Sequence, residues 1–407
     1  MHKNTCYTIL ATLFACTYQP ALARDWSGLI DARLVRASAE RSWTDGGLGK
    51  LRYDAANDGL RLGQAVLRGD ADVADTVSAV LIVQAADDRP HALDITEAWL
   101  RWNPLPTGPW KASVRAGTFF PALSLENDGV GWTTTRTISS SAINSWIGEE
   151  LRNQGVELTL LRRGRAVESL HDIGVSATLL RANDPIGTLL TWRGWGVGDR
   201  ISGLHEALPL ADLPVYRADG MIPKQTRAIH PFRELDGRIG YQFGAHYGYA
   251  GMLTVDVVHY DNRANPLTVV DGQYSWRTRF DHVAASARWG QWTFLLQAMD
   301  GSTLMGAHAA AVKLDAAYVM ASHALGRGQL SLRVDRFVTR DIDVFPSDPN
   351  GEHGRAVALA YAYPLAESWS LIAEALDVAS TRAARTLAGE APRQRERSLT
   401  TALRWRF

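Results

Sequence analysis

The chain has 407 residues, with 43 Lys and Arg balanced by 43 Asp and Glu, and two cysteines. The lack of a basic surplus argues against a nucleic-acid partner, because binding to a phosphate backbone needs excess positive charge. Both cysteines, Cys6 and Cys16, lie in the first 23 residues, which leaves no thiol in the remaining chain for a disulfide or a zinc site.

The first 23 residues have the pattern of a cleaved secretory signal peptide. Lys3 gives a basic start, an apolar run extends from about Tyr7 to Cys16, and small residues precede Arg24. Lipoprotein processing before Cys16 is an alternative. If residues 1–23 are removed, residues 24–407 form the exported protein, and export without disulfides indicates a bacterial envelope protein.

Beyond the signal, no apolar run reaches the roughly 20 residues of a membrane helix. Apolar and polar residues alternate instead, over lengths at which tilted strands cross a bilayer. About sixteen strands are expected, at residues 25–37, 57–69, 73–86, 91–103, 110–120, 151–163, 166–182, 237–248, 251–262, 276–289, 291–301, 308–324, 328–340, 354–364, 368–379 and 396–407.

The connections between these strands alternate between short turns and longer loops. Short turns rich in Gly, Pro and Asp are expected near Gly69, Asn103, Arg162, Gly248, Gly290, Gly326 and Tyr363. The other connections range from residues 86–90 to the long stretch at 183–236. This asymmetry is typical of outer-membrane barrels, so the predicted fold class is all-β: a transmembrane antiparallel up-and-down barrel with short periplasmic turns and long extracellular loops.

Aromatic side chains gather where the predicted strands meet periplasmic turns or chain ends. Such rings form girdles at the boundary of a membrane. The members of this group are Trp26, Trp102, Trp110, Trp289, Trp292, Tyr363, Trp369, Trp405 and Phe407.

The last residues, from Leu399 to Phe407, alternate strictly between apolar and polar side chains. The final strand of a barrel must pair with the first, because an open edge in lipid leaves backbone groups without partners. The stretch also resembles the carboxy-terminal signature by which bacterial outer-membrane proteins are handed to their assembly machinery. That resemblance implies an assembly signal at Trp405 and Phe407.

No catalytic motif is present. The chain has no G-x-S-x-G, no H-E-x-x-H, no phosphate-binding glycine loop and no Cys/His cluster. His171 beside Asp172, or His282 beside Asp281, would point to opposite faces of a strand. A lipase-like Ser/His constellation on a barrel surface is an alternative, but the sequence favours a protein that is not an enzyme and holds no cofactor and no metal.

The loop after the fifth predicted strand, FFPALSLENDGVGWTTTRTISSSAINSWIGEELR at 119–152, is too long for a turn. The chain resembles the sixteen-stranded general porins of Gram-negative bacteria in strand count, in the place of this loop and in its carboxylates, Glu126, Asp128, Glu149 and Glu150. In that family the loop between strands five and six folds inward and narrows the channel. The resemblance therefore implies a constriction loop at 121–150, although the family's Pro-Glu-Phe-Gly-Gly-type stretch is absent.

The same resemblance implies a facing wall of basic side chains. Strand parity places Arg33, Arg61, Arg101, Lys111 and Arg115 on the lumen side, as a pore-lining basic wall or simply as wet lumen positions. The other predicted lumen residues have mixed signs: Asp31, Glu97, Asp256, Lys313, Asp315, Arg333, Asp335 and Glu374. No filter of a single sign emerges.

These features predict an outer-membrane porin for passive diffusion of small hydrophilic solutes. The expected partners are outer-membrane lipid, lipopolysaccharide and the barrel-assembly machinery, and the architecture allows a homotrimer. The expected location is the outer membrane of a Gram-negative bacterium.

Two alternatives remain open. In a substrate-specific channel or exporter, for a sugar or an organic anion, Trp192, Trp195, Tyr216 and Phe232 of the 183–236 loop would stack on the solute, or would instead pack on the barrel rim. A structural or adhesive barrel with a closed lumen would need bulk to fill it. The alanine column at Ala356, Ala358, Ala360 and Ala362 does not supply that bulk.

Overall fold

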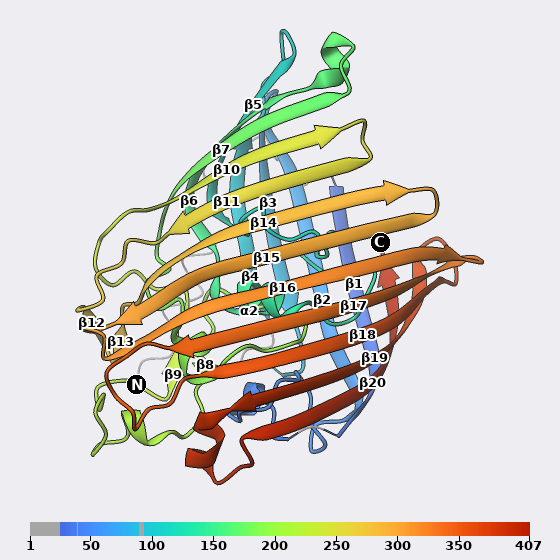
Figure 1. Ribbon diagram of the computed structural model, residues 1–407. Helices are drawn as coiled ribbons and strands as arrows, with labels where there is room; N and C mark the ends of the chain where they lie inside the picture. The colour runs from blue at the N-terminus through green and yellow to red at the C-terminus, as the bar shows by residue number, and fades with distance from the viewer. Residues whose placement is uncertain (1–24, 39, 89–92) are drawn as a thin grey trace, which may run out of the picture.

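The computed structural model describes residues 25–38, 40–88 and 93–407, so the predicted signal peptide lies outside the described residues. Sixteen strands form one closed barrel in which each pairs antiparallel with the next barrel strand along the chain, and the last pairs with the first (Figure 1). The predicted strand number and up-and-down topology are confirmed. The barrel strands are β1 (Asp25–Ala37), β2 (Gly59–Ala74), β3 (Val77–Ala85), β4 (Asp94–Trp102), β5 (Trp110–Phe119), β6 (Asn153–Arg162), β7 (His171–Arg181), β10 (Gly240–Tyr249), β11 (Leu253–Asp261), β14 (Arg277–Trp289), β15 (Trp292–Met305), β16 (Ala310–Leu325), β17 (Gly328–Asp341), β18 (Glu352–Pro364), β19 (Trp369–Arg382) and β20 (Arg393–Arg406).

Smaller elements lie in the connections. Two short hairpins pair β8 (Leu208–Pro209) with β9 (Ala228–Ile229) and β12 (Val269–Val270) with β13 (Gln273–Tyr274). The α-helices are α2 (Ala142–Glu150) and α3 (Thr188–Trp192), and 3-10 turns occur at Trp43–Asp45, Gly164–Val167, Pro214–Tyr216 and Ala383–Ala388. Within the described residues, no helix combines the length and the apolar character needed to cross a membrane.

One predicted turn is displaced. The Gly and Asp residues near Gly69 favoured a turn there, but Asp70 and Asp72 pair with Val80 and Ser78 in the β2–β3 ladder. The turn follows at residues 75–76. The hydrogen bonds of an extended hairpin therefore override the local turn preference of these residues.

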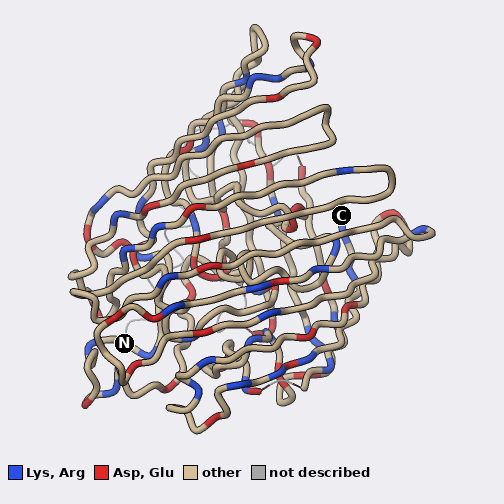
Figure 2. The backbone as a smooth tube through the Cα atoms, viewed as in Figure 1, with Lys and Arg blue, Asp and Glu red and all other residues tan. Residues whose placement is uncertain are grey.

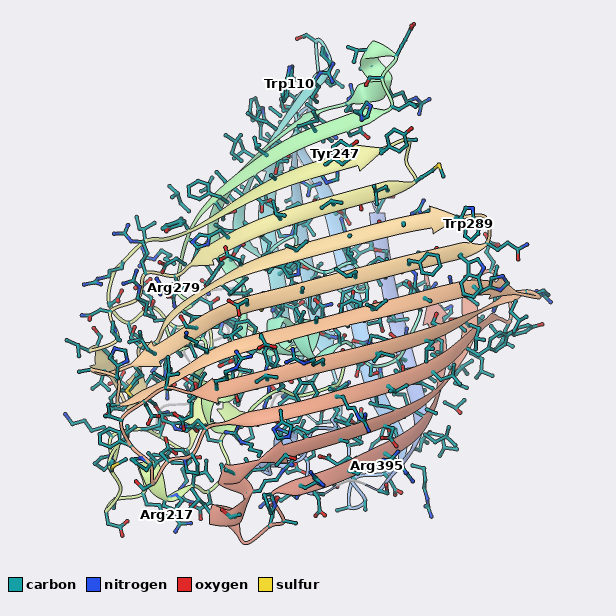
Figure 3. All side chains as sticks on the ribbon, viewed as in Figure 1. Trp110, Arg217, Tyr247, Arg279, Trp289 and Arg395 are labelled. Atoms are coloured by element: carbon teal, nitrogen blue, oxygen red, sulfur yellow. The ribbon has the colours of Figure 1, made fainter. Side chains whose placement is uncertain are left out.

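The two ends of the barrel differ. The turn end carries the connections at 75–76, 103–109, 163–170, 250–252, 290–291, 326–327 and 365–368, and the loop end carries the others. Trp110, Tyr247 and Trp289 lie at the turn end (Figure 3). Every member of the predicted aromatic group is in or next to a strand terminus at this end, and seven of them are exposed: Trp26, Trp102, Trp110, Trp289, Trp292, Trp369 and Phe407.

The wall alternates between an apolar outer face and an inner face. On β18, Val357 and Leu359 are 40% and 48% exposed on the outer face, whereas Ala356 and Ala358 between them are fully buried inside. This is the period of two that an extended strand imposes. The outer face is the one suited to lipid.

The carboxy-terminal strand closes the barrel, as its alternation predicted. β20 pairs with β1 from Leu29 opposite Arg406 to Ala37 opposite Ser398, and the Gly28 and Phe407 backbones exchange two more hydrogen bonds. The Phe407 ring lies over Gly28, where a Cβ atom would come within 2.3 Å of it. A glycine at position 28 therefore lets the terminal ring seat against the first strand.

Candidate functional site in the lumen

Three loops occupy the loop half of the barrel interior, and we call them together the plug: residues 40–58, 120–152 and 182–239. Each loop contributes apolar side chains to a main core shared with inward residues of the wall. This core includes Trp146 and Ile147 of α2, Leu190 and Trp195 of the long loop, and Phe280, Leu314 and Phe337 of the strands. Figure 1 shows α2 inside the ring of strands. The loop half of the lumen is therefore packed like a protein interior.

The helix α2 enters the lumen with local support from its own sequence. The Ser141 side chain caps its first turn by accepting a hydrogen bond from the Asn144 backbone N–H. All nine residues of the helix are buried. Trp146 packs edge-on against Trp195 and Phe280, with ring centroids 6.0 and 5.7 Å away.

The packing extends around the whole circumference. Each of the sixteen barrel strands contributes at least one inward residue that is no more than 2% exposed. One such set is Arg33, Gln64, Gln84, Thr96, Phe119, Asn153, Leu180, Gln242, Tyr260, Thr278, Thr303, Leu314, Phe337, Ala356, Val378 and Glu396. Large side chains such as Tyr260 and Phe337 reach full burial only because the plug covers them.

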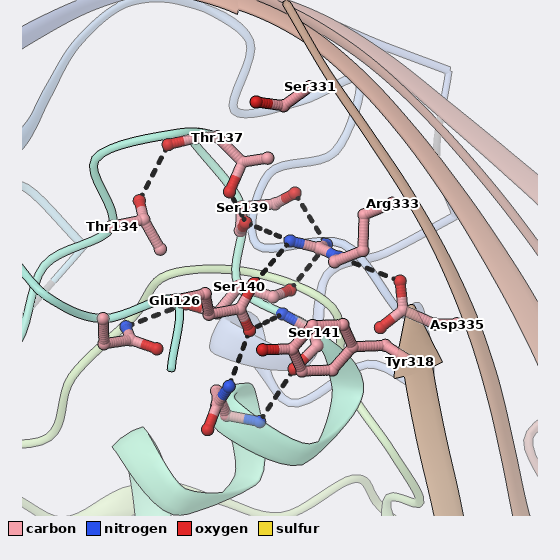
Figure 4. Close-up of polar contacts among 12 residues, drawn as sticks. Glu126, Thr134, Thr137, Ser139, Ser140, Ser141, Tyr318, Ser331, Arg333 and Asp335 are labelled. Atoms are coloured by element: carbon pink, nitrogen blue, oxygen red, sulfur yellow. Dashed lines mark hydrogen bonds and ion pairs between the residues drawn. The ribbon is translucent and has the colours of Figure 1, made fainter. Parts of the chain in front are cut away.

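Arg333 on β17 fastens the 120–152 loop to the wall (Figure 4). Its guanidinium donates to Asp335 at 2.9 Å, to Glu126 at 3.1 Å and to the Ser140 carbonyl at 2.9 Å. Glu374 on β19 accepts from the Ile138 and Ser139 backbone N–H groups at 2.8 and 3.0 Å. Four predicted site residues thus meet here, as anchors of the loop.

A second chain of buried charges runs from the wall into the long loop. Asp31 accepts from Arg404 and from Arg33, each at 2.8 Å. Arg33 also pairs with Asp199 of the 182–239 loop, and Asp199 pairs in turn with Arg52 at 3.0 Å. The signs alternate along the chain, which is the arrangement that lets charges be buried without an unpaired ion.

The loops of the plug are also joined to one another. Glu149 of α2 pairs with Arg193 at 2.5 Å, and the Ser145 hydroxyl donates to the Gly198 carbonyl at 2.7 Å. Glu150 accepts from Trp146 Nε1 at 2.6 Å and from the Leu189 backbone N–H at 3.0 Å. Burial raises the pKa of the Glu150 carboxyl to about 7. The 120–152 and 182–239 loops therefore form one interlocked body.

Lys50 fixes the 40–58 loop in the same way. Its ammonium group pairs with Glu352 of β18 at 2.6 Å, and both side chains are fully buried. The backbone N–H of Lys50 donates to Glu396 of β20 at 2.8 Å. The first loop is therefore held against the wall of β18 to β20.

The turn half of the lumen is different, because a cavity lined by both polar and apolar residues lies there. It has a volume of about 260 Å³, and Ala122 of the plug contributes to its lining together with residues of β6, β7, β10 and β11. Its polar wall includes Glu157, Gln242, His246 and Asp256. Glu157 pairs with Arg115 at 2.8 Å, and Asp256 pairs with His246 at 2.7 Å. We call this space the vestibule.

The five predicted basic-wall residues are divided between these regions. Arg33 lies within the buried charge chain, and Arg61 lies near the loop end, 3.8 Å from Asp87. Arg101, Lys111 and Arg115 lie on the turn halves of β4 and β5, and the Arg101 guanidinium sits 4.9 Å from the Trp99 ring centroid. Glu97 is buried and accepts from the Phe120 backbone N–H.

The loop acids and the predicted basic wall form no ion pairs with each other. Glu126 pairs with Arg333, Asp128 with Arg136 and Glu149 with Arg193. In the part of the chain that the structure describes, none of the four loop carboxylates forms an ion pair with Arg33, Arg61, Arg101, Lys111 or Arg115. The apolar side chains of the loop pack on both sides of the barrel, with Ile138 against Ile372 of β19 and Val130 against Val66 of β2.

Lys313 and Asp315 are not lumen residues, contrary to the prediction. On β16 the buried inward positions are Val312, Leu314 and Ala316, and Asp315 pairs instead with Arg336 and Arg340 on the outer face. The prediction assumed that the lumen is wet and that charged residues point into it. On this part of β16 the plug presents an apolar surface, so Leu314 points inward and Lys313 and Asp315 point outward.

The aromatic residues of the long loop are packed rather than free to contact a solute. Trp192, Trp195, Tyr216 and Phe232 are at most 7% exposed. The Trp192 ring lies 5.2 Å from those of both Tyr216 and Trp276. These four residues pack inside the plug. Of the two interpretations of the long loop, this packing favours the one in which its aromatic residues pack on the barrel and do not stack on a solute.

Sequence reasoning missed the charged residues that seat the plug, above all Lys50, Arg193, Asp199, Glu352 and Glu396. Glu352 and Glu396 lie on the inward side of their strands, so parity could have found them. The loop residues gave no such signal. Their partners lie on other elements of the fold, and Asp199 and Arg33 are 166 positions apart in the chain.

One cluster of carboxylates has a spacing compatible with a metal ion. Oxygens of Asp184, Glu234 and Asp236 lie within 4.8 Å of one another at the base of the long loop. They already accept backbone hydrogen bonds, from Leu235 to Asp184 and from Ala182 and Gly237 to Glu234. The cluster therefore serves to order the loop, and we assign no metal to it.

Comparisons with known proteins identify the fold. No protein-family profile and no curated protein sequence matches the chain. Its structure is similar to the outer membrane channel DcaP of Acinetobacter baumannii (TM-score 0.55, 11% identity, 94% of this chain and 96% of the other). It is also similar to an anion-selective porin from Comamonas acidovorans (0.53, 12%, 94% and 99%) and to a loop L8 deletion mutant of OmpT from Vibrio cholerae (0.54, 8%, 94% and 98%). The chain thus has the sixteen-stranded barrel fold of outer-membrane porins.

Proposed function

We propose that the protein is a porin-type channel of the Gram-negative outer membrane for passive diffusion of small hydrophilic solutes, and that the plug closes it in this conformation. The observation that carries the proposal is the vestibule, whose wall includes charged and polar side chains. It occupies the turn half of a barrel with an apolar outer face and ends at a plug made of loops. A vestibule of this kind would hold water and small polar molecules.

The contacts of the plug support a closure that can move. Its seat combines an apolar core with ion pairs such as Arg333 to Glu126 and Lys50 to Glu352. Buried ion pairs contribute little net stability compared with apolar packing of the same volume. Because the 120–152 and 182–239 loops are joined to each other, passage of a solute would require them to shift together.

The remaining expectations belong to the same proposal. Export through a cleaved signal peptide, assembly by the barrel-assembly machinery with a signal at Trp405 and Phe407, and contact with membrane lipid and lipopolysaccharide would follow for an outer-membrane barrel. A homotrimer is compatible with the exposed apolar outer face. We propose no enzymatic activity, no cofactor and no metal.

A second function is favoured by a specific observation. The ring of buried residues on all sixteen strands is what a barrel with a permanently closed lumen would show. Such a protein would have a structural or adhesive role. A substrate-specific channel remains compatible with the vestibule, but its solute would contact the polar vestibule wall and not the four aromatic residues of the long loop.

Recording in planar bilayers separates the channel from the closed barrel. We would compare the exported chain with a variant in which residues 188–230 are replaced by a short Gly-Ser linker. The control variant shortens the connection at 163–170, which lies at the turn end, away from the plug. A channel should give rare openings in the parent chain and a large steady conductance in the plug variant only. If the folded plug variant conducts no better than the parent chain, the channel proposal fails.

A further inference from the structure

The outer face of the barrel carries an unusual group of charges on the loop halves of β16 to β20. Outward residues there include Arg336, Arg340, Arg395 and Arg397, whose side chains are 54% to 65% exposed. Figure 2 shows basic positions along these strands, and Arg395 is labelled on this side of the barrel in Figure 3. A wall that faces only acyl chains would exclude such residues, because charges on a lipid face are strongly destabilising.

The strand register arranges these residues in transverse rows. One row across β17, β18, β19 and β20 consists of Arg336, Arg355, Ala379 and Arg395. The next row toward the loop end is Val338, His353, Thr381 and Arg393. Neighbouring strands are about 4.8 Å apart, so the first row spans about 14 Å from Arg336 to Arg395.

Between the arginines lies a surface groove, which we call the basic trough. It has a volume of about 870 Å³, and its floor is made of small residues, including Gly354 and Ala379. Its sides are formed by the basic residues of the two rows: Arg336, His353, Arg355, Arg393 and Arg395. The small side chains over β19 leave room for an anion between two sets of guanidinium groups.

Two carboxylates hold the outer arginines in place. Asp315 accepts from Arg336 at 2.8 Å and from Arg340 at 2.6 Å. Asp377 accepts from Arg395 at 3.0 Å and from Arg397 at 2.7 Å. Each acid is shared by two arginines, so each set retains a net positive charge.

The central arginines of the trough are not neutralised. Within the described residues, Arg355 and Arg393 form no ion pair. The trough therefore combines two guanidinium groups held by carboxylates, those of Arg336 and Arg395, with two that form no ion pair. Arginine binds phosphate groups through paired, planar hydrogen bonds, so this is a site for phosphate.

The rows toward the turn end become apolar. After the basic row comes Val334, Val357, Asp377 and Arg397, and after that Leu332, Leu359, Ala375 and Leu399. The change from basic to apolar takes only two rows. The surface is thus complementary to a molecule with phosphates at one end and hydrocarbon at the other.

Other strands carry exposed apolar residues on the outer face near the loop end. At the loop end of β1 and β2, the outward residues Leu34 and Leu60 are 63% and 82% exposed. On β7 the outward Leu179 is 61% exposed close to the loop end. Outward basic residues also lie near the loop end of other strands, such as Arg36 on β1, Arg279 on β14 and Lys313 on β16, so the trough is distinguished by its two facing rows and not by basic character alone.

We propose that the basic trough binds a membrane lipid whose head group carries more than one phosphate. The phosphates lie between Arg336, Arg355 and Arg395, and the acyl chains lie along Leu332, Leu359 and Leu399. This inference rests on the proposed membrane location. It commits to a lipid, because a free phosphate would make no use of the apolar rows that continue from the trough.

The test is lipid binding by the purified, folded chain in neutral detergent, measured by native mass spectrometry. The probes are bis-phosphorylated lipid A, phosphatidylcholine and inorganic pyrophosphate. The variant R355Q/R393Q/R395Q should lower the affinity for lipid A by roughly tenfold or more, because three charge-assisted donors are lost. The control R36Q/R238Q, at exposed arginines outside the trough, should stay within about twofold.

Each outcome decides the proposal. Unchanged lipid A binding in the triple variant overturns it, as does equal binding of phosphatidylcholine. Full competition by pyrophosphate at equal concentration shows an anion site without lipid specificity and also overturns it. Loss of a dimer or trimer in the triple variant, with lipid binding intact, would mean that the trough contacts a second copy of the chain.

Two further measurements keep the result independent of folding and of the proposed function. Heat-modifiable gel mobility reports whether each variant is folded, and R355Q alone removes a residue with no ion pair, so the fold should be unaffected. Binding is read without any conductance measurement. A barrel that never conducts would refute the proposed channel but not lipid binding by the trough. A chain recovered outside the outer membrane would refute the membrane location on which the lipid proposal rests.

Discussion

The two halves of the lumen are built by the same strands and differ in what covers them. In the loop half, inward residues such as Phe337 and Leu314 are fully buried under the plug. In the turn half, the inward residues around Glu157 and Asp256 line a cavity with both polar and apolar walls. An inward position on a barrel strand is therefore covered by a folded loop in one half and borders the vestibule in the other.

The largest expected effect comes from removing the anchor of the plug. Arg333→Ala leaves Glu126 and Asp335 buried without their partner, which should lower the free energy of unfolding by about 3–5 kcal/mol. Arg68→Gln, at a partly exposed pair with Asp70 in the turn half, should cost at most about 1 kcal/mol. Urea unfolding followed by tryptophan fluorescence measures both. Equal costs would show that the two halves are not different environments.

Side-chain volume tests the same comparison. Ala358→Leu adds bulk beneath the plug, at a fully buried position, and should cost about 1–3 kcal/mol. Thr159→Leu, in the wall of the vestibule, should change the stability by no more than about 0.5 kcal/mol, because open space is available there. The midpoint of thermal unfolding reports both. A large cost at Thr159 would mean that the vestibule is packed as well.

The pH dependence of the plug should depend on Glu150. Burial raises the pKa of this carboxyl from 4.5 to about 7 in the seated plug. Between pH 4.5 and about 7, the Glu150 carboxyl is protonated when the plug is seated and ionised when the plug is unseated. The free energy that favours the seated plug should therefore decrease as the pH rises through this range and stay constant above it. The open probability in bilayers should rise over that range. Glu150→Gln should remove this part of the dependence, and an identical profile in the variant would contradict the assignment.

The smallest expected effect concerns ion selectivity. Arg101→Ser with Arg115→Ser removes positive charge from the turn half and should shift the zero-current potential in a salt gradient toward cation preference. The shift should shrink in high salt, because these side chains are only partly buried. Glu126→Gln should not produce the opposite shift, since Glu126 is buried against Arg333. If Glu126→Gln by itself changed the ion selectivity, that result would support an acidic constriction, which the contacts of Glu126 argue against.

The sequence by itself determined the wall of this barrel. Period-two alternation is a property of the extended backbone, so it specified all sixteen strands and the pairing of the last strand with the first. The aromatic residues at the turn end followed from the same pattern. These features need only local sequence and the rule that a barrel leaves no open edge.

Only the tertiary structure decided what fills the barrel. Arg33 meets Asp199 across 166 residues, and Arg333 meets Glu126 across 207, and no local pattern encodes such pairs. The error at Lys313 and Asp315 has the same origin, because polarity assigns a strand's inward face only when the lumen is known to be wet. Once the loops pack an apolar core into the loop half, burying Leu314 is favourable and burying Lys313 is not, so the plug sets the facing of the strand.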